Sequence, residues 1–310
     1  MVNGILLVDK EIGPTSHDLV GRVRRIFKQK RVGHCGTLDP AATGLLVILL
    51  GQATRLAPWL QQKEKVYEGT IRLGRATDTF DAQGEVTAQA VCRVEQAQVD
   101  AATLALTGAY SQIPPVYSAI KVQGRPAYES ARQGLTVELK PRDVNIDEFK
   151  AKIVESGDYP LVKFRVACSS GTYIRSLAVD FGEELGCPAH IESLRRLRVG
   201  RFAVEDGRTT EELMSMDDEA LRENIVSLRD AVDFAEVFPD DEDMRALGNG
   251  ARISATIPGN RFQENFGADE AVVKIVEPAS GRLIALGRME KPEVGQAKAQ
   301  VKPFLVFASN

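Results

Sequence analysis

Residues 33–46 read GHCGTLDPAATGLL, and the prediction of the fold begins from this segment. Three glycines and Pro40 favour an ordered loop, and the proline holds Asp39 in an extended conformation. The aliphatic residues that continue to position 50 predict a fully buried strand. Asp39 therefore stands on a loop just before a buried strand, beside the imidazole of His34. Such a loop suits chemistry at a cleft, and a carboxylate that only stabilises the turn is the alternative.

A basic amphipathic helix is predicted immediately before this loop. Thr15 and Asp18 have the spacing of a capping box at its start. The apolar residues that follow fall on one arc of the helix, and most of the basic residues fall opposite. Residues 22–31 contain six basic side chains, a density that suits phosphate contacts. A solvated helix face is the alternative, and the residues alone leave both readings open.

Further helices and strands are predicted along the rest of the chain, followed by a change of pattern near its end. Strands are expected at residues 65–73 and 160–168, helices at 53–61, 95–107 and 171–185, and short terminal strands at 271–276, 282–287 and 300–307. The sequence therefore predicts an α+β fold with a mixed central β-sheet flanked by helices. A small β-rich module is expected beyond a boundary near residues 236–243.

The charge of the chain is distributed unevenly. The net charge is −4, but residues 205–243 hold fifteen acidic residues against three arginines. That segment carries −12, so the remainder of the chain carries +8. A basic body with one acidic segment permits a nucleic-acid surface, although a basic enzyme with a solvated acidic helix pair fits equally well.

Several classes of protein are excluded by the sequence. The longest aliphatic run is residues 45–50, far short of the roughly 18 residues of a membrane span. The start of the chain has no secretory pattern, so a cytoplasmic location is expected. The four cysteines and three histidines are scattered, without C-x-x-C or H-x-x-x-H spacing. Neither a zinc site nor a disulfide framework is expected, and no cofactor is implied.

Residues 33–46 resemble the catalytic motif of the TruB family of tRNA pseudouridine synthases. Three further blocks resemble that family in the same order. They are residues 65–84 (KVYEGTIRLGRATDTFDAQG), 114–134 (PPVYSAIKVQGRPAYESARQG) and 169–200 (SSGTYIRSLAVDFGEELGCPAHIESLRRLRVG). The resemblance covers roughly the first 200 residues, whereas the terminal module resembles a PUA domain mainly by position and layout. One departure is Glu11, where the family usually has proline, and it affects the expected shape of that loop.

The resemblance implies an isomerase that converts uridine to pseudouridine in the T-arm loop of tRNA, at the nucleotide numbered 55 by convention. It implies a catalytic domain over residues 1–236, with a thumb-like insertion at about 123–143 and an acidic helical segment at about 205–236. It also implies an RNA-binding PUA-like domain over residues 237–310, which would hold the tRNA acceptor stem. A monomer that needs neither metal nor cofactor is expected.

The family motif assigns roles to particular residues of this chain. By that resemblance the catalytic residues are Asp39 as nucleophile or base, Arg175 as its ion partner and Tyr67 as the aromatic group that stacks on the uracil. The substrate-binding residues are His34 as a wedge in the RNA loop, Tyr173 beside the flipped base and Leu194 in the pocket wall, together with Tyr67. Asp39 could capture the sugar as a covalent adduct or remove its C2′ proton, and the sequence leaves both routes open. Without the resemblance, Tyr67 would be a half-buried strand aromatic and Arg175 an exposed helix residue.

Other surfaces and other functions follow from the same residues. The predicted basic helix, the arginines at positions 195, 196, 198 and 201, and the thumb with Tyr128 and Arg132 are candidate phosphate-binding surfaces. A tRNA-binding folding chaperone and an RNA-guided relative of the enzyme are the alternative functions. A nucleoside-hydrolysing glycosidase is a weaker one, because it would need a second carboxylate as acid.

Overall fold

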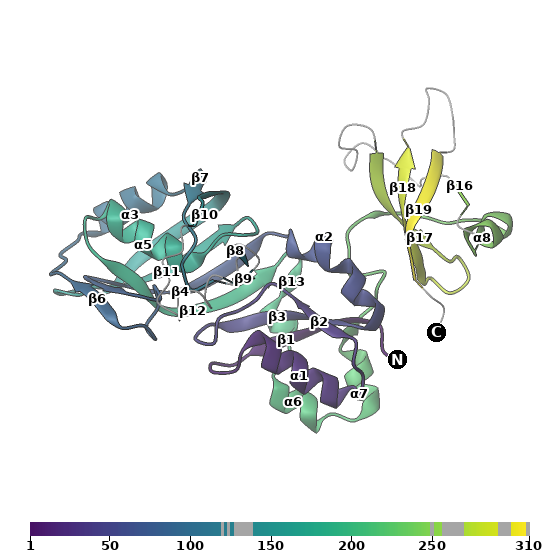
Figure 1. The fold of residues 1–310 in the computed structure, drawn as a ribbon, viewed down its shortest axis with the longest axis horizontal. Helices are drawn as coiled ribbons and strands as arrows, with labels where there is room; N and C mark the ends of the chain where they lie inside the picture. The colour runs from purple at the N-terminus through teal and green to yellow at the C-terminus, as the bar shows by residue number, and fades with distance from the viewer. Residues whose placement is uncertain are drawn as a thin grey trace.

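The structure of the chain is a computed structural model (Figure 1). It describes residues 1–118, 121–122, 125–126, 139–248, 251–255, 270–290 and 299–307. Helices cover a large mixed sheet, and a smaller sheet follows near the C-terminus, so the predicted α+β class is confirmed. Most of the predicted thumb at residues 123–143 lies outside the described residues, together with Tyr128 and Arg132.

The large sheet has the strand order β14-β1-β3-β12-β4-β11-β10-β7, with β2 paired to β3 and β13 paired to β12. Its strands are β1 (Gly4–Lys10), β2 (Val32–Cys35), β3 (Thr43–Leu50), β4 (Lys65–Leu73), β7 (Gly108–Gln112), β10 (Arg142–Glu155), β11 (Leu161–Cys168), β12 (Ala189–Val199), β13 (Phe202–Ala203) and β14 (Ile225–Val226). β3 and β12 run parallel and pair at only two positions, Thr43 with Arg195 and Gly44 with Arg196. This short pairing joins the two antiparallel parts of the sheet.

Helices pack on the sheet through apolar residues at helical spacing. Those that follow the N-terminus up to residue 184 are α1 (Ser16–Ile26), 3₁₀ helix η1 (Gly51–Leu56), α2 (Ala57–Gln61), α3 (Gln96–Ala105) and α5 (Ile174–Glu184). The capping box of α1 is confirmed, since Asp18 N donates to Thr15 Oγ1 and Thr15 N donates to the Asp18 carboxylate. On α5, Phe181 packs against Phe149 of β10, with ring centroids 5.5 Å apart. No helix among the described residues is long and apolar enough to cross a bilayer.

The acidic segment is helical only in part. It contains 3₁₀ helix η2 (Val204–Asp206), α6 (Thr210–Ser215) and α7 (Asp218–Glu223) before strand β14. β14 then pairs with β1 at one edge of the large sheet. The acidic segment therefore joins the large sheet through β14, and α6 lies against α1.

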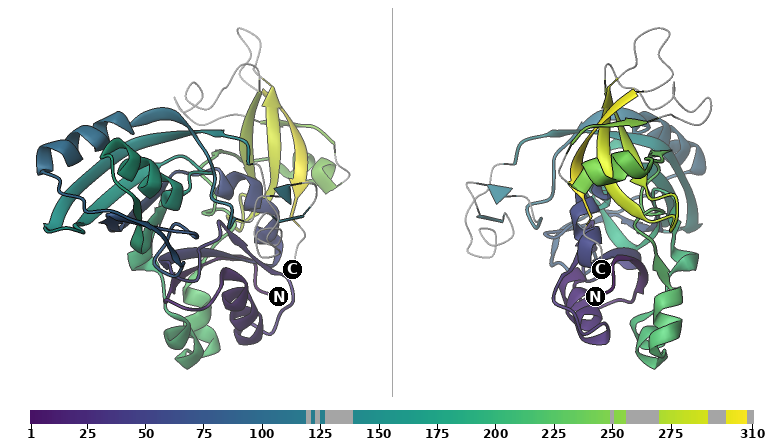
Figure 2. Two further views of the ribbon diagram at one scale, coloured as in Figure 1. Left: turned by 60° about the vertical axis from the view of Figure 1, so that its left-hand side comes forward. Right: turned by 90° about the vertical axis from the view of Figure 1, so that its right-hand side faces the viewer.

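The C-terminal module is a sheet of five strands in the order β15-β17-β18-β19-β16. Its elements are β15 (Ala235–Val237), α8 (Asp241–Gly248), β16 (Ile253–Ala255), β17 (Glu270–Val276), β18 (Leu283–Glu290) and β19 (Ala299–Val306). Figures 1 and 2 show this sheet as a separate group of strands, and Trp59 of α2 contacts Phe304 at 5.9 Å between ring centroids. β15 already belongs to this sheet, so the predicted boundary between residues 236 and 237 falls inside a strand.

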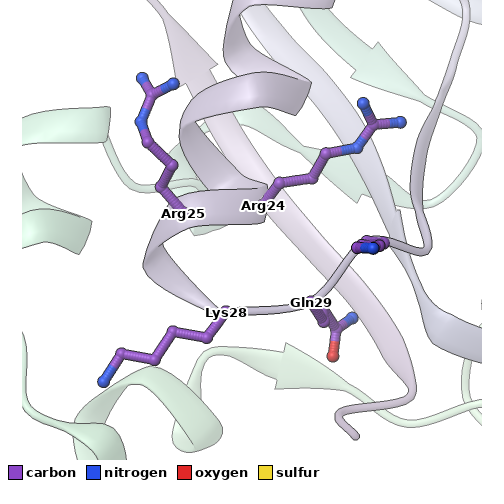
Figure 3. A pocket seen from close by; sticks show the side chains of 5 residues that line it. Arg24, Arg25, Lys28 and Gln29 are labelled. Atoms are coloured by element: carbon purple, nitrogen blue, oxygen red, sulfur yellow. The ribbon is translucent and has the colours of Figure 1, made fainter.

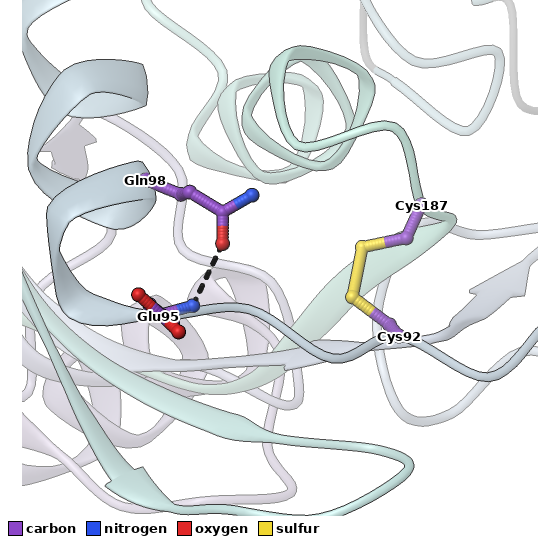
Figure 4. The surroundings of a disulfide bond; sticks show 4 residues. All are labelled: Cys92, Glu95, Gln98 and Cys187. Atoms are coloured by element: carbon purple, nitrogen blue, oxygen red, sulfur yellow. Dashed lines mark hydrogen bonds between the residues drawn. A yellow bond between two sulfur atoms is a disulfide. The ribbon is translucent and has the colours of Figure 1, made fainter.

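Cys92 and Cys187 form a disulfide, so the expectation of no disulfide was wrong (Figure 4). The two cysteines are 95 residues apart in sequence, and their Cα atoms are 5.9 Å apart. Gly74 explains the approach, because its carbonyl accepts from Ala90 N and its N–H donates to Pro188 O. Ala90 and Pro188, which are close in sequence to Cys92 and Cys187, are thus both bound to Gly74. The spacing of the cysteines in the sequence does not reveal this arrangement. Cys35 and Cys168 are free and buried.

Reduction of this disulfide is expected to lower the free energy of unfolding by about 2–4 kcal/mol, because a cross-link across so long a loop restricts the unfolded chain. Urea unfolding with and without a thiol reductant measures the change. The double variant Cys92→Ser/Cys187→Ser is the control and should show no response to the reductant. An equal response in the double variant would assign the effect to the buried thiols instead.

Candidate active site

The loop that carries Asp39 is held by elements on both sides of it. β2 pairs with β3 from Val32 to Cys35, so the predicted loop starts three residues later than the sequence suggested. Backbone hydrogen bonds to β3 keep residues 33–35 in a strand, although Gly33 favoured a loop. At the start of α1, Ser16 Oγ donates to Leu38 O at 3.0 Å and accepts from Leu38 N at 2.9 Å. The loop is thus fixed one residue before Asp39.

Two buried cations hold the main chain of this loop. The guanidinium of Arg196 is 1% exposed, and it donates to Leu45 O at 2.7 Å, to Gly36 O at 2.9 Å and to Thr37 O at 3.4 Å. Two of these acceptors, Gly36 O and Thr37 O, lie just before Asp39, so Arg196 holds that side of the loop. Carbonyl groups that lost this donor would be left unpaired in the interior, at a cost of about 1–3 kcal/mol each.

Lys10 holds the other side of the loop. Its ammonium donates to Ala42 O at 2.6 Å, to Pro40 O at 3.2 Å and to Glu11 O at 3.0 Å. Burial lowers the pKa of Lys10 to about 8, against the opposing attraction of Asp39 and Glu11. Only the neighbouring Glu11 was singled out in the sequence, and nothing there indicated which carbonyls Lys10 would bind.

The prediction that the arginines at positions 195, 196, 198 and 201 form a phosphate-binding surface was wrong for Arg196, which is buried. The other arginines of the cluster have carboxylate partners. Arg195 binds Asp9 through two bonds of 3.0 and 2.7 Å, and the remaining pairs are Arg198 with Glu64 and Arg201 with Asp233. The pairing of β12 with β4 shifts register between Arg196 and Arg198, so the regular alternation of the strand is broken there, and Arg196 is buried while Arg198 is exposed.

Asp39 and Arg175 form a direct ion pair. Arg175 Nε lies 2.9 Å from Asp39 Oδ2. Arg175 is buried on the first turn of α5, and its other nitrogens donate to Thr79 O at 2.9 Å and to Tyr117 O at 2.8 Å. The two carbonyls fix the direction of the guanidinium, so it presents one N–H to the carboxylate. The pair that the resemblance implied is therefore present in the structure.

A second carboxylate, Asp81, lies on the other side of Arg175 and was not predicted. Its Oδ2 is 4.0 Å from Arg175 Nη1, while its Oδ1 accepts from Thr79 Oγ1 at 2.7 Å and from Gln83 N at 3.0 Å. The turn that carries it includes Phe80 in the left-handed region, with φ of 63°. The turn-rich residues 78–84 were visible in sequence, but only the fold brings them to Arg175.

These groups surround a small cavity of about 20 Å³. Its lining residues are Asp39, Ala41, Ala42, Asp81, Ala82, Arg175, Ile191, Glu192, Ser193 and Leu194. Leu194 thus lies in the wall, as the resemblance implied. Ligand pockets usually measure about 300–1,000 Å³, so a nucleobase could enter this cavity only after side chains around it move.

The other candidate residues, Tyr67, Tyr173 and His34, do not line this cavity, although Asp39 is close enough to Tyr67 and Tyr173 to help burial raise their pKa. Tyr67 of β4 is 7% exposed, and burial raises its pKa although the nearby Arg196 opposes the shift. Tyr173 precedes α5, and the amide of Gln112 bonds both its N–H (2.8 Å) and its carbonyl (3.2 Å). Gln112 is buried and was not predicted as a support for the site.

His34 lies on β2, opposite Ile48 of β3. Its Nδ1 is buried without a hydrogen-bond partner among the described residues. Burial lowers the pKa of His34, and the charge of Arg196 adds to the effect. A neutral imidazole of this kind is suited to stacking, and its role as a wedge stays a prediction.

Replacement of Arg196 with methionine is expected to lower the free energy of unfolding by about 3 kcal/mol or more, because several buried acceptors lose their donor. Arg198→Met, two positions along the same strand, is the control. Its exposed pair with Glu64 should contribute less than about 1 kcal/mol. Urea unfolding of both variants measures the difference, and equal losses would show that the bonds of Arg196 to the loop contribute little.

Known proteins resemble this chain in sequence. The family described as "TruB family pseudouridylate synthase (N terminal domain)" matches residues 24–174, and "tRNA pseudouridylate synthase B C-terminal domain" matches residues 175–233. A protein of Thermobifida fusca named tRNA pseudouridine synthase B is 46% identical over 91% of this chain and 96% of its own length. A protein of the same name from Dechloromonas aromatica is 39% identical over 91% of this chain and 94% of its own length.

Solved structures share the fold. The chain resembles one in the crystal structure of an archaeal box H/ACA sRNP Nop10-Cbf5 complex, with a TM-score of 0.70 and 25% identity over 99% of this chain and 86% of that one. A chain from an H/ACA RNP bound to a substrate RNA containing 2′-deoxyuridine has a TM-score of 0.72 at 24% identity, over 99% of this chain and 85% of that one. The fold and the sequence matches together define a protein of the pseudouridine synthase class. Within that class, the chain belongs to the TruB family.

Proposed function

We propose that this chain converts the uridine at position 55, in the T-arm loop of tRNA, to pseudouridine. The observation that carries the proposal is the Asp39–Arg175 ion pair of 2.9 Å, on a loop held by Lys10 and Arg196 and beside a cavity. The names of the similar proteins support tRNA as the substrate. The proposed location is the cytoplasm and the proposed state is a monomer.

The proposed chemistry begins when the N-glycosidic bond of the uridine breaks. Positive charge develops on the ribose, and the Asp39 carboxylate either captures C1′ or removes the C2′ proton. The electron pair of the broken bond leaves with N1 of the uracil. The uracil turns and its C5 bonds to C1′; on the covalent route this breaks the bond between C1′ and the Asp39 carboxylate, and on the other route Asp39 returns the proton to C2′. The C5 hydrogen then leaves as a proton, and N1 takes up a proton. Arg175 orients the carboxylate and supplies the opposite charge beside it. Tyr67 is proposed as the group that stacks on the uracil and assists loss of the C5 proton.

Entry of the uracil requires that it leaves the folded RNA loop. A flipped base pays the cost of unstacking, and protein side chains that replace its neighbours offset that cost. His34 is proposed to fill the space it leaves, and Tyr173 and Leu194 to contact the base. The cavity beside Asp39 is too small in the present structure, so base entry and widening of the cavity are proposed to occur together. The catalytic domain is proposed to span residues 1–236 and the PUA-like domain, which would hold the acceptor stem, residues 237–310.

Tritium release tests the reaction. A tRNA transcript labelled at uracil C5 is incubated with the chain, and release from position 55 is expected because that hydrogen is replaced by the bond to ribose. A transcript with cytidine at position 55 is the control and should release nothing above background. Tight binding without release would favour the alternative of a tRNA folding chaperone. Release that required an added guide RNA would favour the RNA-guided alternative.

A further inference from the structure

The C-terminal end of α1 presents a group of cations outside the active site. We name it the basic turn and define it as residues 24–31. Its exposed cations are Arg24, Arg25, Lys28, Lys30 and Arg31. None of these five forms an ion pair with a described residue. The arginines of β12 differ, because each is either buried or paired with a carboxylate.

The cations surround a shallow hollow rather than a flat surface. Figure 3 shows Arg24, Arg25 and Lys28 spreading apart around the end of the helix, and Lys30 also lines the hollow. A neighbouring hollow shares Lys28 and Lys30 and reaches α7, where Asp218 is the one acidic residue in its lining. Positive charge around a concave surface raises the local concentration of a polyanion.

The main chain of the basic turn is fixed. Lys28 N donates to Arg25 O and Gln29 N donates to Arg24 O, which is the Schellman pattern of a helix end. The side chain of Gln29 accepts from Val2 N at 2.9 Å and donates to Val2 O at 3.2 Å. The cations therefore project from a rigid support, which reduces the ordering cost when a ligand binds.

Lys28 occupies the position in this pattern where glycine is usual. Its φ is 48°, and among the described non-glycine residues only Phe80, in the turn of Asp81, also has a positive φ. A side chain in this region costs free energy that glycine avoids. An unfavourable lysine at this position indicates a use for its charge, because residues held in sparsely populated conformations cluster at functional sites.

The basic turn and the loop that carries Asp39 lie at opposite ends of one strand, β2. β2 joins them, and a strand rises about 3.3 Å per residue, so Arg31 and Cys35 are about 13 Å apart. We propose that the basic turn binds phosphates of the RNA strand beside the target uridine, as a second contact outside the catalytic pocket. This inference rests on the proposed function, because it takes tRNA as the ligand.

The test is the salt dependence of tRNA binding by Lys28→Gly/Lys30→Gln, measured by filter binding of a transcript. Each lost phosphate contact lowers the slope of log K against log salt by about 0.7–0.9, or about five- to eightfold in affinity at 0.1 M salt. The double variant should thus bind about 25- to 60-fold more weakly, with a slope lower by about 1.4–1.8. Glycine suits the conformation of residue 28, so the thermal midpoint should not fall.

The control removes two positive charges elsewhere. Lys152 and Lys163 are exposed, face one another across β10 and β11, and lie several strands away from β2. Lys152→Gln/Lys163→Gln should keep the native slope. A native slope in the basic-turn variant, or an equal loss in this control, would overturn the inference. Failure of the proposed function is separate, since it would appear as absent tritium release by the unaltered chain.

Discussion

The variant Asp39→Asn is expected to release tritium from position 55 at least about 10³-fold more slowly than the unaltered chain, with tRNA affinity within about threefold. The amide keeps the size of the side chain, but it can neither capture C1′ nor remove the C2′ proton. Single-turnover release and filter binding with the same transcript measure the two quantities. The loop should keep its shape, because Ser16, Lys10 and Arg196 bind its main chain and not the Asp39 side chain.

Asp147→Asn is the matched control for this prediction. Asp147 is exposed on β10, so the change removes one carboxylate without altering the site. Native activity is expected for it. Turnover by Asp39→Asn within tenfold of native would mean that Asp39 takes no part in the reaction. Parallel loss of turnover and tRNA binding would mean that Asp39 is needed for the structure of the site.

The second large effect is expected for Arg175→Lys, with a fall in turnover of about 10²-fold or more. Lysine keeps the charge, but its single nitrogen cannot replace three nitrogens that meet Asp39, Thr79 O and Tyr117 O in a fixed plane. The carboxylate would lose its fixed direction. The free energy of unfolding should also fall by roughly 1–3 kcal/mol, because a buried carbonyl loses its donor.

Arg165→Lys is the control for this change, since Arg165 is exposed on β11 and the substitution is chemically the same. Turnover at saturating tRNA and urea unfolding are measured for both variants. A fall in tRNA affinity with unchanged turnover would mean that Arg175 contacts the RNA rather than orienting Asp39.

Local signals in the sequence predicted much of the fold. The capping box at Thr15 and Asp18 fixed the start of α1, and alternation fixed β4 at residues 65–73. The aliphatic run before residue 50 predicted β3, buried at every position after Thr43. These signals depend only on residues close in sequence, so a periodic pattern is sufficient to find them.

The parts that the sequence did not predict depend on distant contacts. Asp81 meets Arg175 only because its turn is bound to β12 through Ile191. Cys92 and Cys187 meet because Ala90 and Pro188, close to them in sequence, both bond to Gly74. Arg196 and Arg198 look alike in a run of arginines, and the register shift between them in the pairing of β12 with β4 separates a buried support from a surface ion pair. No local pattern contains that information.

The two-position pairing of β3 with β12 has a consequence for how the protein is made. Arg196 Nε reaches Leu45 O from 151 residues further along the chain. A nascent chain that emerges from the ribosome therefore exposes the Asp39 loop long before its support is synthesised. Until the arginine follows, Gly36, Thr37 and Leu45 lack that donor. A truncated translation product that ends before β12 accordingly lacks the donor that holds the Asp39 loop, even though it contains all of residues 33–46.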